Sequence, residues 1–279
     1  MFKRHFKPQY LNSISDDFAG NNGIGCYVLL PNSDAHARQI ADQFSDLTIK
    51  SHPHWHNLYL GNINADNQKI DVAVISTGMG CASIEIILHE LFHLGAKRFL
   101  RIGTAGSLQP RFVKPGDFIN AQAAIRDQSN AIHYVPIEYP AVASLEFTSS
   151  ILLAAETLNL SEQLHTGIVH CKNSAYAREL SPGPKAEENK SYMDVLTHAG
   201  ALATEMETST FFIQSQIYNH KLRSNGLSPE DCVLAGAILG INYVMDNYNH
   251  SEKDDSITAA LAEIALESIK ILATQEVIG

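Results

Sequence analysis

The sequence has few cysteines and no long hydrophobic run. Its four cysteines, Cys26, Cys81, Cys171 and Cys232, are far apart in 279 residues and form no Cys-x-x-Cys pair. This spacing is typical of reduced thiols in or near a core and indicates a reducing compartment. The longest apolar run, 232–241, is about half of what a bilayer span needs. No apolar segment follows the basic residues near the start, so we predict no secretory signal, no membrane association and a cytoplasmic location.

Basic residues are also scarce. Lys and Arg together number 20 against 30 Asp and Glu, which gives a net charge of −10 with neutral histidines. An acidic chain is a poor match for nucleic acid or an anionic membrane, so we expect neither as a partner. A small anionic substrate is still compatible, because one buried arginine can bind a phosphate whatever the net charge. The 45% hydrophobic content excludes disorder as the main state.

The order of elements predicts an α/β fold. No repeat, low-complexity stretch or linker divides the chain, so we predict one domain, 1–279. Apolar runs of strand length occur at 25–30, 70–75, 98–102, 166–171 and 232–239. Helical periodicity marks 37–44, 84–94, 145–158, 205–218 and a C-terminal helix from 255 or 256. We predict a strand pair over 113–124 and a polar loop or helix start over 183–190. Short loops between strand, helix and strand predict parallel crossovers and three layers.

Two glycine segments, 77–80 and 103–106, are predicted to be turns that end successive parallel strands. Ligands of open α/β sheets bind outside the carboxyl ends of strands, and glycine lets backbone N–H groups approach an anion or a sugar. The first segment is not a full dinucleotide fingerprint, because Ser83 replaces the third glycine. Taken alone, each segment is more typical of a simple tight turn.

Arg101 is a charged residue in an otherwise apolar strand. An unpaired buried charge is costly, so Arg101 must be paired or functional. One interpretation is a structural salt bridge to a core carboxylate. The other is an oxyanion ligand held by the guanidinium and the Thr104 hydroxyl.

Two carboxylates flank a methionine in Glu205-Met206-Glu207, at the start of a predicted helix. An ionised carboxylate only accepts hydrogen bonds, so it can clamp the two neighbouring hydroxyls of a ribose. The simpler alternative is that both acids complement the positive end of the helix dipole.

Three histidines, His52, His54 and His56, occupy alternate positions. On a strand their side chains would face one way. No carboxylate or cysteine is nearby in sequence, so we predict no metal site.

Taken together and in this order, the motifs resemble the family-1 nucleoside phosphorylases, and within them the uridine phosphorylases. The resemblance extends roughly from Gly25 to the C-terminal helix. It implies a three-layer α/β/α sandwich around a mixed, partly barrel-like sheet, and a homo-oligomer, either a dimer or a hexamer of dimers. It rests on 76–80, 90–91, 94–95, 99–106, 115–117 and 205–207.

The resemblance also implies a reaction and a set of site residues. Phosphate attacks the ribose of a nucleoside and gives a free base and ribose 1-phosphate, with no metal or organic cofactor. Arg101 and Thr104 would hold phosphate, and Thr104 would also touch the sugar. Glu207 would accept from the 2′- and 3′-hydroxyls, and we count these three as catalytic. The residues that would contact substrate are Asn32, His36, Gly106, Tyr176, Glu205 and Met206, with Met206 packed on the ribose.

The phosphate site departs from the family pattern. Asn32-Ser33-Asp34 stands in place of Gly-Asp-Pro, and His36 and Pro53 stand where two further arginines are expected. Each charged hydrogen bond that is lost typically costs about 1.5–3 kcal/mol. His36 would compensate in part, since histidine carries a fractional charge near neutral pH.

The base site departs too. Uridine phosphorylases bind uracil with a Gln-x-Arg sequence in a loop that corresponds to 175–180 here. This chain has no Gln-x-Arg there, Ala175 replaces the Phe that stacks on the base, and Tyr176 is retained. Arg178 and Glu179 are the polar side chains nearby. The late strand, 239–243, has neither the Asn-Arg of uridine enzymes nor the Asp of purine enzymes. The sequence therefore does not determine which base the substrate carries.

Three functions therefore remain. A phosphorylase with altered base preference is favoured, with a uridine-like substrate. A nucleosidase would use water instead, and would need Glu205 or His36 as a general base. A non-catalytic nucleoside-binding relative would keep the fold without the reaction.

Overall fold

The computed structural model describes residues 7–53, 56–65, 68–180, 183–224, 226, 232–245 and 254–278. Ten strands in these residues belong to one sheet. They are Tyr27–Leu30 (β1), Ser45–Lys50 (β2), Leu58–Ala65 (β3), Gln68–Ile75 (β4), Arg98–Ser107 (β5), Phe118–Asp127 (β6), Ala141–Val142 (β7), Leu164–Lys172 (β8), Ala203–Glu205 (β9) and Leu234–Val244 (β10). The helices are Asp34–Ala41 (α1), Cys81–His93 (α2), Leu145–Thr157 (α3), Ala175–Glu179 (α4), Ala186–His198 (α5), Thr208–Ser224 (α6) and Asp254–Ile278 (α7).

Part of the sheet closes on itself. The strand order is β10-β6-β8-β9-β5-β1-β4-β3-β2, and β10 also pairs with β5. Strands β10, β6, β8, β9 and β5 therefore form a barrel, from which β1, β4, β3 and β2 continue as an open sheet. Parallel and antiparallel pairs both occur, so the expected mixed, partly barrel-like sheet is confirmed.

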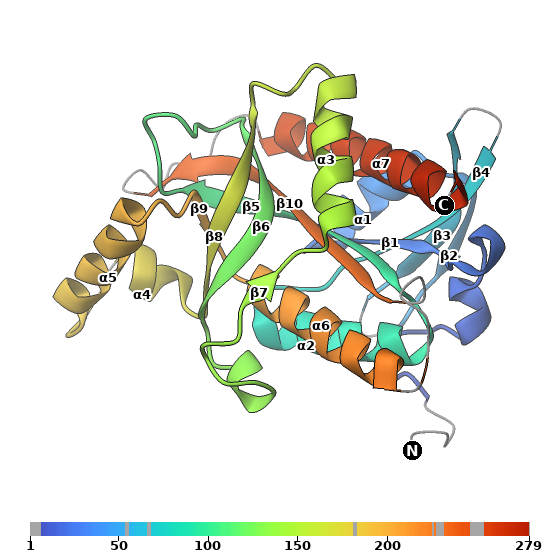
Figure 1. Ribbon diagram of the computed structural model, residues 1–279, viewed down its shortest axis with the longest axis horizontal. Coiled ribbons are helices and arrows are strands. Elements are labelled where there is room, and N and C mark those ends of the chain that lie inside the picture. The colour runs from blue at the N-terminus through green and yellow to red at the C-terminus, as the bar shows by residue number, and fades with distance from the viewer. Residues whose placement is uncertain are drawn as a thin grey trace.

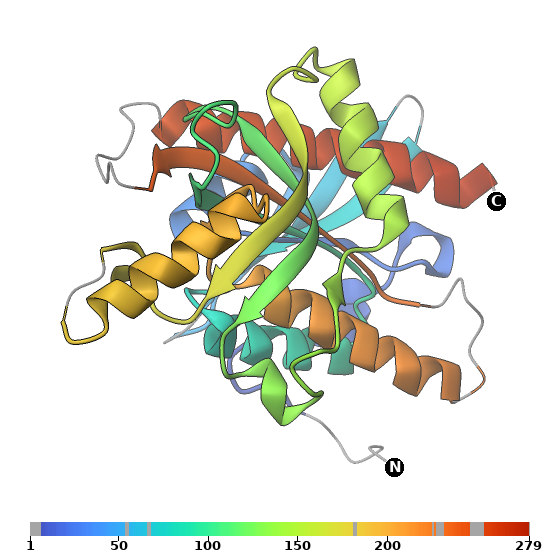
Figure 2. The same cartoon turned by 60° about the vertical axis from the view of Figure 1, so that its left-hand side comes forward.

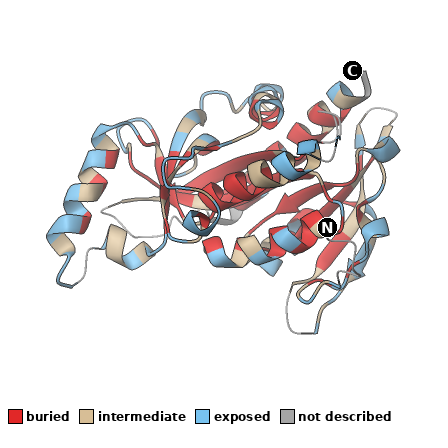
Figure 3. Ribbon diagram, turned by 60° about the horizontal axis from the view of Figure 1, so that its bottom comes forward, coloured by how far each residue is buried: buried red, intermediate tan, exposed pale blue. Residues whose placement is uncertain are grey.

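Helices cover both faces of this sheet. α3 and α7 lie against one face with α1 behind them, and α2 and α6 lie side by side on the other (Figures 1 and 2). Strand β1 shows why a fully apolar run forms here: Val28 and Leu30 enter the core under α2 and α6, whereas Tyr27 and Leu29 enter the core under α1 and α7. Buried strands between helices with exposed outer faces confirm the three layers (Figure 3).

Most predicted elements are confirmed, two are corrected, and one hairpin is additional. The segment 103–106 is not a turn, because β5 continues through it to Ser107 and pairs with both β10 and β9. The stretch 113–124 is not a strand pair, because only β6 starts within it, at Phe118. The hairpin of β2 and β3 was not predicted at all, since its outer strand has no buried residue to reveal it.

All four cysteines are buried and unbridged, as the sequence predicts. Cys81 and Cys171 lie far apart in sequence, yet their sulfur atoms are 3.7 Å apart in the core. Among the described residues, we find no helix with both the length and the apolar character needed to cross a bilayer.

Candidate active site

The candidate site forms where β1 and β4 end beside the middle of β5. β1 lies between the other two strands and is parallel to both, and its last residue, Leu30, is level with Arg101 of β5. The backbone N–H groups of Thr77 and Gly78, just after β4, donate to the carbonyls of Pro31 and Asn32, just after β1, at 2.8 and 3.0 Å. These contacts hold the two loops together beside Arg101 of β5.

The segment 77–80 is a glycine turn, as predicted. Gly78 and Gly80 have φ values of 71° and 86°, which favour glycine strongly. Ser83, which takes the place of the third glycine of a dinucleotide fingerprint, stabilises the turn. Its hydroxyl donates to the Thr77 carbonyl at 2.6 Å. The N–H of Gly80, just before α2 begins, donates to Glu207 Oε1 at 2.6 Å. The turn therefore presents a backbone donor to a negative group, as an anion site requires.

Arg101 is the charged centre of the site and has no exposed surface. Its Nη1 donates to Asn32 Oδ1 at 2.8 Å, and its Nη2 contacts Glu207 directly and Glu205 at 3.4 Å. Burial lowers the pKa of the guanidinium, but the two carboxylates outweigh this and raise it above its ordinary value. Within the described residues Nε has no hydrogen-bond partner, so the group retains a donor for an oxyanion.

The two carboxylates of the Glu-Met-Glu motif differ in what they do. Glu205 ends β9 and accepts the backbone N–H groups of Glu207 at 2.8 Å and of Thr208 at 3.0 Å. It therefore caps the start of α6, in line with the helix-terminus interpretation. Glu207 instead faces Arg101 and Gly80. Burial raises the pKa of Glu207 and Glu205 raises it further, against the lowering by Arg101.

Other predicted site residues lie further along β5 and just after β9. Thr104 is half-buried in β5 and pairs with Gly240. Gly106 lies two residues after Thr104 in β5. Only glycine fits at this position, because a Cβ would overlap the Tyr243 ring and lie 2.8 Å from its hydroxyl. Met206 is half-buried, and its carbonyl accepts from the thiol of Cys81 at 3.1 Å.

The remaining predicted residues lie farther out. His36 is half-buried in the first turn of α1, where its backbone N–H is capped by Ser33 at 3.3 Å. Tyr176 lies on α4 with 68% of its surface exposed. Pro53 is exposed in the loop between β2 and β3, so it brings no cation to this site. The predicted roles of His36 and Tyr176 stay predictions.

The three histidines do not share a strand. β2 ends at Lys50 and β3 begins at Leu58, so His52 and His56 lie in the loop between them, and His54 lies outside the described residues. His56 Nδ1 is 2.8 Å from Ser76 Oγ, which connects this loop to the end of β4. Among the described residues, no three metal-ligating side chains are grouped to hold an ion.

Sequence reasoning missed a buried polar chain beside the site. His170 Nε2 is 3.0 Å from Asp127 Oδ2, and His170 Nδ1 is 3.0 Å from the hydroxyl of Thr204. The ammonium of Lys172 donates to the same hydroxyl at 3.1 Å and forms an ion pair with Glu179. Alternation in β8 was the available signal, since it places His170 and Lys172 on one face.

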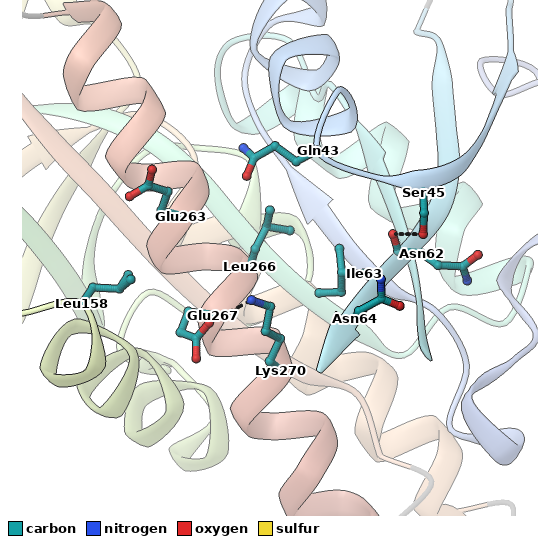
Figure 4. Close-up of a pocket in the computed structure, with 10 residues that line it drawn as sticks. All are labelled: Gln43, Ser45, Asn62, Ile63, Asn64, Leu158, Glu263, Leu266, Glu267 and Lys270. Carbon is teal, nitrogen blue, oxygen red and sulfur yellow. Dashed lines mark hydrogen bonds and ion pairs between the residues drawn. The ribbon is translucent and has the colours of Figure 1, made fainter. Parts of the chain in front are cut away.

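Figure 4 shows a separate groove of about 270 Å³ between the β2–β3 hairpin and α7. None of its lining residues belongs to the predicted site. Its cation, Lys270, lies 3.0 Å from Glu267 and is already neutralised. The groove therefore offers no competing anion site.

The fold, a barrel continued by an open sheet, and the contact of Arg101 with Glu205 and Glu207 define the class of protein. Residues 26–273 match the phosphorylase superfamily, and the chain belongs to that family. A uridine phosphorylase of Treponema pallidum is 31% identical over 259 residues, which cover 91% of this chain and 92% of the relative. A uridine phosphorylase of Thermococcus kodakarensis is 31% identical over 273 residues, 96% of this chain and 90% of its own length. A guanosine phosphorylase of Halorubrum lacusprofundi is 28% identical over 246 residues, 88% and 90% of the two chains. Relatives named for a pyrimidine and for a purine nucleoside are thus almost equally similar.

Proposed function

We propose that this protein is a nucleoside phosphorylase, most active on a uridine-like pyrimidine nucleoside, which it converts with phosphate to a free base and ribose 1-phosphate. The observation that carries the proposal is the contact of Arg101 with Glu207 beside the Gly80 N–H. A cation for phosphate and an acceptor for a ribose diol are adjacent there. The similarity to uridine phosphorylases supports the pyrimidine preference. A homo-oligomer with phosphate and nucleoside as its small-molecule partners completes the proposal.

Each group has one task in this reaction. Phosphate binds Arg101 and the Thr104 hydroxyl, and Glu207 exchanges its contact with Gly80 for the 2′- and 3′-hydroxyls of the ribose. A phosphate oxygen forms the new bond to C1′ while the bond from C1′ to the base nitrogen breaks, and its electron pair leaves with the base. The negative phosphate stabilises the positive charge that develops on the ribose. Phosphate is already a nucleophile, so its attack needs no general base.

A second candidate, a nucleosidase that uses water, is favoured by one observation. Arg101 already has carboxylate partners, and histidine and proline occupy the positions of the two other expected arginines. Such an enzyme needs a general base for water. Both oxygens of Glu205 accept backbone N–H groups, which leaves a histidine, His36, for that role.

The deciding experiment measures base release by chromatography with and without phosphate. Arg101→Lys keeps the charge but loses the planar fork, so the KM for phosphate should rise about 10- to 100-fold, the equivalent of one charged hydrogen bond. Arg98→Lys is the matched control. Arg98 is a second buried arginine of β5 and pairs with Glu276, away from the site. An unchanged KM for phosphate in Arg101→Lys would contradict the phosphate site, and release without phosphate would establish the nucleosidase.

A further inference from the structure

We propose that Lys172, Glu179 and Tyr243 form the subsite that reads the base, and that they select a base with a lactam edge, a ring N–H next to a carbonyl. The inference rests on the proposed function, because it places the glycosidic bond beside Thr104 and Gly106. Uracil, hypoxanthine and guanine carry this edge, whereas cytosine and adenine present a ring nitrogen next to an amino group.

The three residues adjoin the sugar end of the site. Tyr243 pairs with Gly106 across β10 and β5, and its ring covers the space that a side chain at Gly106 would fill. Lys172 ends β8, directly after Cys171, which pairs with Glu205 of the Glu-Met-Glu motif. Lys172 is also close enough to Glu207 for its positive charge to lower the pKa of that carboxylate. A base attached to a ribose on Glu207 would therefore extend toward this group.

The subsite consists of charges in a place where structure alone would favour apolar residues. The side chains of Lys172 and Glu179 are 2% and 0% exposed and form an ion pair. Well-packed apolar residues commonly stabilise a core at least as well as a buried ion pair, so stability does not account for this choice. The Tyr243 hydroxyl donates to Glu179 Oε2 at 2.7 Å, so one carboxylate is held from two sides.

A chain of hydrogen bonds fixes the direction of the lysine. Burial lowers the pKa of His170, so its imidazole is neutral and carries one proton. With that proton on Nε2 for Asp127, Nδ1 accepts from the hydroxyl of Thr204, whose oxygen then accepts from Lys172. Arg178 holds the other end of the chain, with two bonds of 2.6 and 2.7 Å to Asp127. Asp127, His170 and Thr204 are thus positioning residues.

The unused hydrogen-bonding capacity of the subsite is complementary to a lactam. An ammonium group has three donors, and the described contacts of Lys172 with Glu179 and Thr204 use two of them. The third can donate to a carbonyl oxygen, while the carboxylate of Glu179 accepts the neighbouring ring N–H. Cytosine or adenine would place a ring-nitrogen lone pair against the carboxylate, which disfavours them. When the base leaves as an anion, its charge spreads onto the carbonyl oxygen beside Lys172, where the ammonium stabilises it.

The first test measures kcat/KM with phosphate for uridine, inosine, guanosine, cytidine and adenosine. We expect the best lactam nucleoside to exceed cytidine and adenosine by about 100-fold or more. A preference for uridine would show that the subsite fits a pyrimidine lactam, and a preference for inosine would show that it fits a purine lactam. Glu179→Gln should reduce the lactam preference by at least about tenfold, because an amide can also donate to a ring nitrogen. Equal activity on cytidine or adenosine in the wild type, or an unchanged preference in Glu179→Gln, would overturn the proposal.

A matched control exists in the same protein. Tyr27, Glu276 and Arg98 form a second group of hydroxyl, carboxylate and cation away from the site, with Tyr27 donating to Glu276 at 2.5 Å. Glu276→Gln should leave the base preference unchanged.

Breaking one side of a buried pair can unfold a protein, so a double variant is also needed. Lys172→Met with Glu179→Leu removes both charges. It should keep a melting temperature near that of the wild type and lose the preference. A folded double variant with the wild-type preference would contradict the subsite.

A binding measurement separates this proposal from the proposed function. Calorimetry with free uracil and free hypoxanthine requires no turnover. If phosphate releases no base from any nucleoside, yet Glu179→Gln weakens binding of one free base at least about tenfold, the proposed function fails and the subsite stands. Equal affinity in wild type and Glu179→Gln, or no binding of either base, would overturn the subsite whatever the turnover shows.

Discussion

At the scale of single residues, the site is a set of charged groups that contact one another. Arg101 has no exposed surface, yet its guanidinium is held by Asn32 and two glutamates. A buried guanidinium without a carboxylate partner would be costly, so the sequence alone could show only that Arg101 must be paired or functional. The proposed function therefore requires Glu207 to exchange its existing contact with Gly80 for the ribose hydroxyls.

The buried imidazole of His170 should make stability depend on pH. Burial lowers its pKa and outweighs the contact with Asp127, which raises it. The unfolded chain takes up a proton near pH 6.5, whereas the folded chain does so only at lower pH. Stability from this group is therefore complete above pH 6.5 and is lost as the pH falls through the lowered native pKa.

Thermal melts of wild type and His170→Gln between about pH 7.5 and pH 5 measure this effect. The variant, which cannot titrate there, should lose less stability on acidification. His56 and His89 also have lowered pKa values and titrate in both proteins, so only the difference in slope belongs to His170. Parallel curves would show that His170 is not the group responsible.

At the scale of elements, the long β5 decides what the second glycine segment does. Gly103 and Gly106 have the local composition of a turn, but β10 and β9 pair with this stretch and keep it extended. The glycines remain necessary for another reason, since Arg101 and Tyr243 pack where their side chains would be. The segment predicted to face the ligand is thus part of a strand, with Thr104 between the glycines.

Helix α2 should depend on the segment that precedes β1. Glu90, 4% exposed, accepts the backbone N–H groups of Gln9, Tyr10 and Leu11 at 2.7 to 3.2 Å. Glu90→Gln replaces one acceptor oxygen by an amide donor and removes the charge. We expect the free energy of unfolding to fall by about 1.5–3 kcal/mol in urea titration. The control Glu156→Gln, at an exposed position on α3, should change the free energy of unfolding by less than about 0.5 kcal/mol. An equal effect at both positions would contradict a stabilising role for the hydrogen bonds of Glu90.

At the scale of the whole molecule, barrel closure brings side chains from distant segments close together. Strands β5, β9 and β10 supply Arg101, Glu205 and Tyr243, and β8 adds Lys172 from the other side of β9. The barrel is held by close packing against helices as well as by strand pairing. A Cβ at Gly236 of β10 would lie 2.5 Å from the Cβ of Phe147 on α3.

Gly236→Ala should therefore destabilise the fold by about 1–3 kcal/mol, as overpacked core substitutions do. Urea unfolding with an unchanged m-value is the measurement. Phe147→Leu in the same chain should recover part of the loss, because the two changes act on one contact. Strict additivity of the two single effects would show that β10 and α3 do not pack as described.

The sequence by itself determined the elements whose burial repeats locally, such as β1, β4 and α2, because strand and helix periodicity depend on neighbours within a few residues. It also determined the family, and it predicted site roles for Arg101 from its apolar strand and for Glu207 from the Glu-Met-Glu motif. Only the tertiary structure decided that Glu205 caps α6 whereas Glu207 makes the closer contact with Arg101, because the two residues are only two positions apart and differ in direction. The group of Lys172, Glu179 and Tyr243 likewise arises from β8, α4 and β10, segments that are far apart in sequence and that only the folded chain brings together.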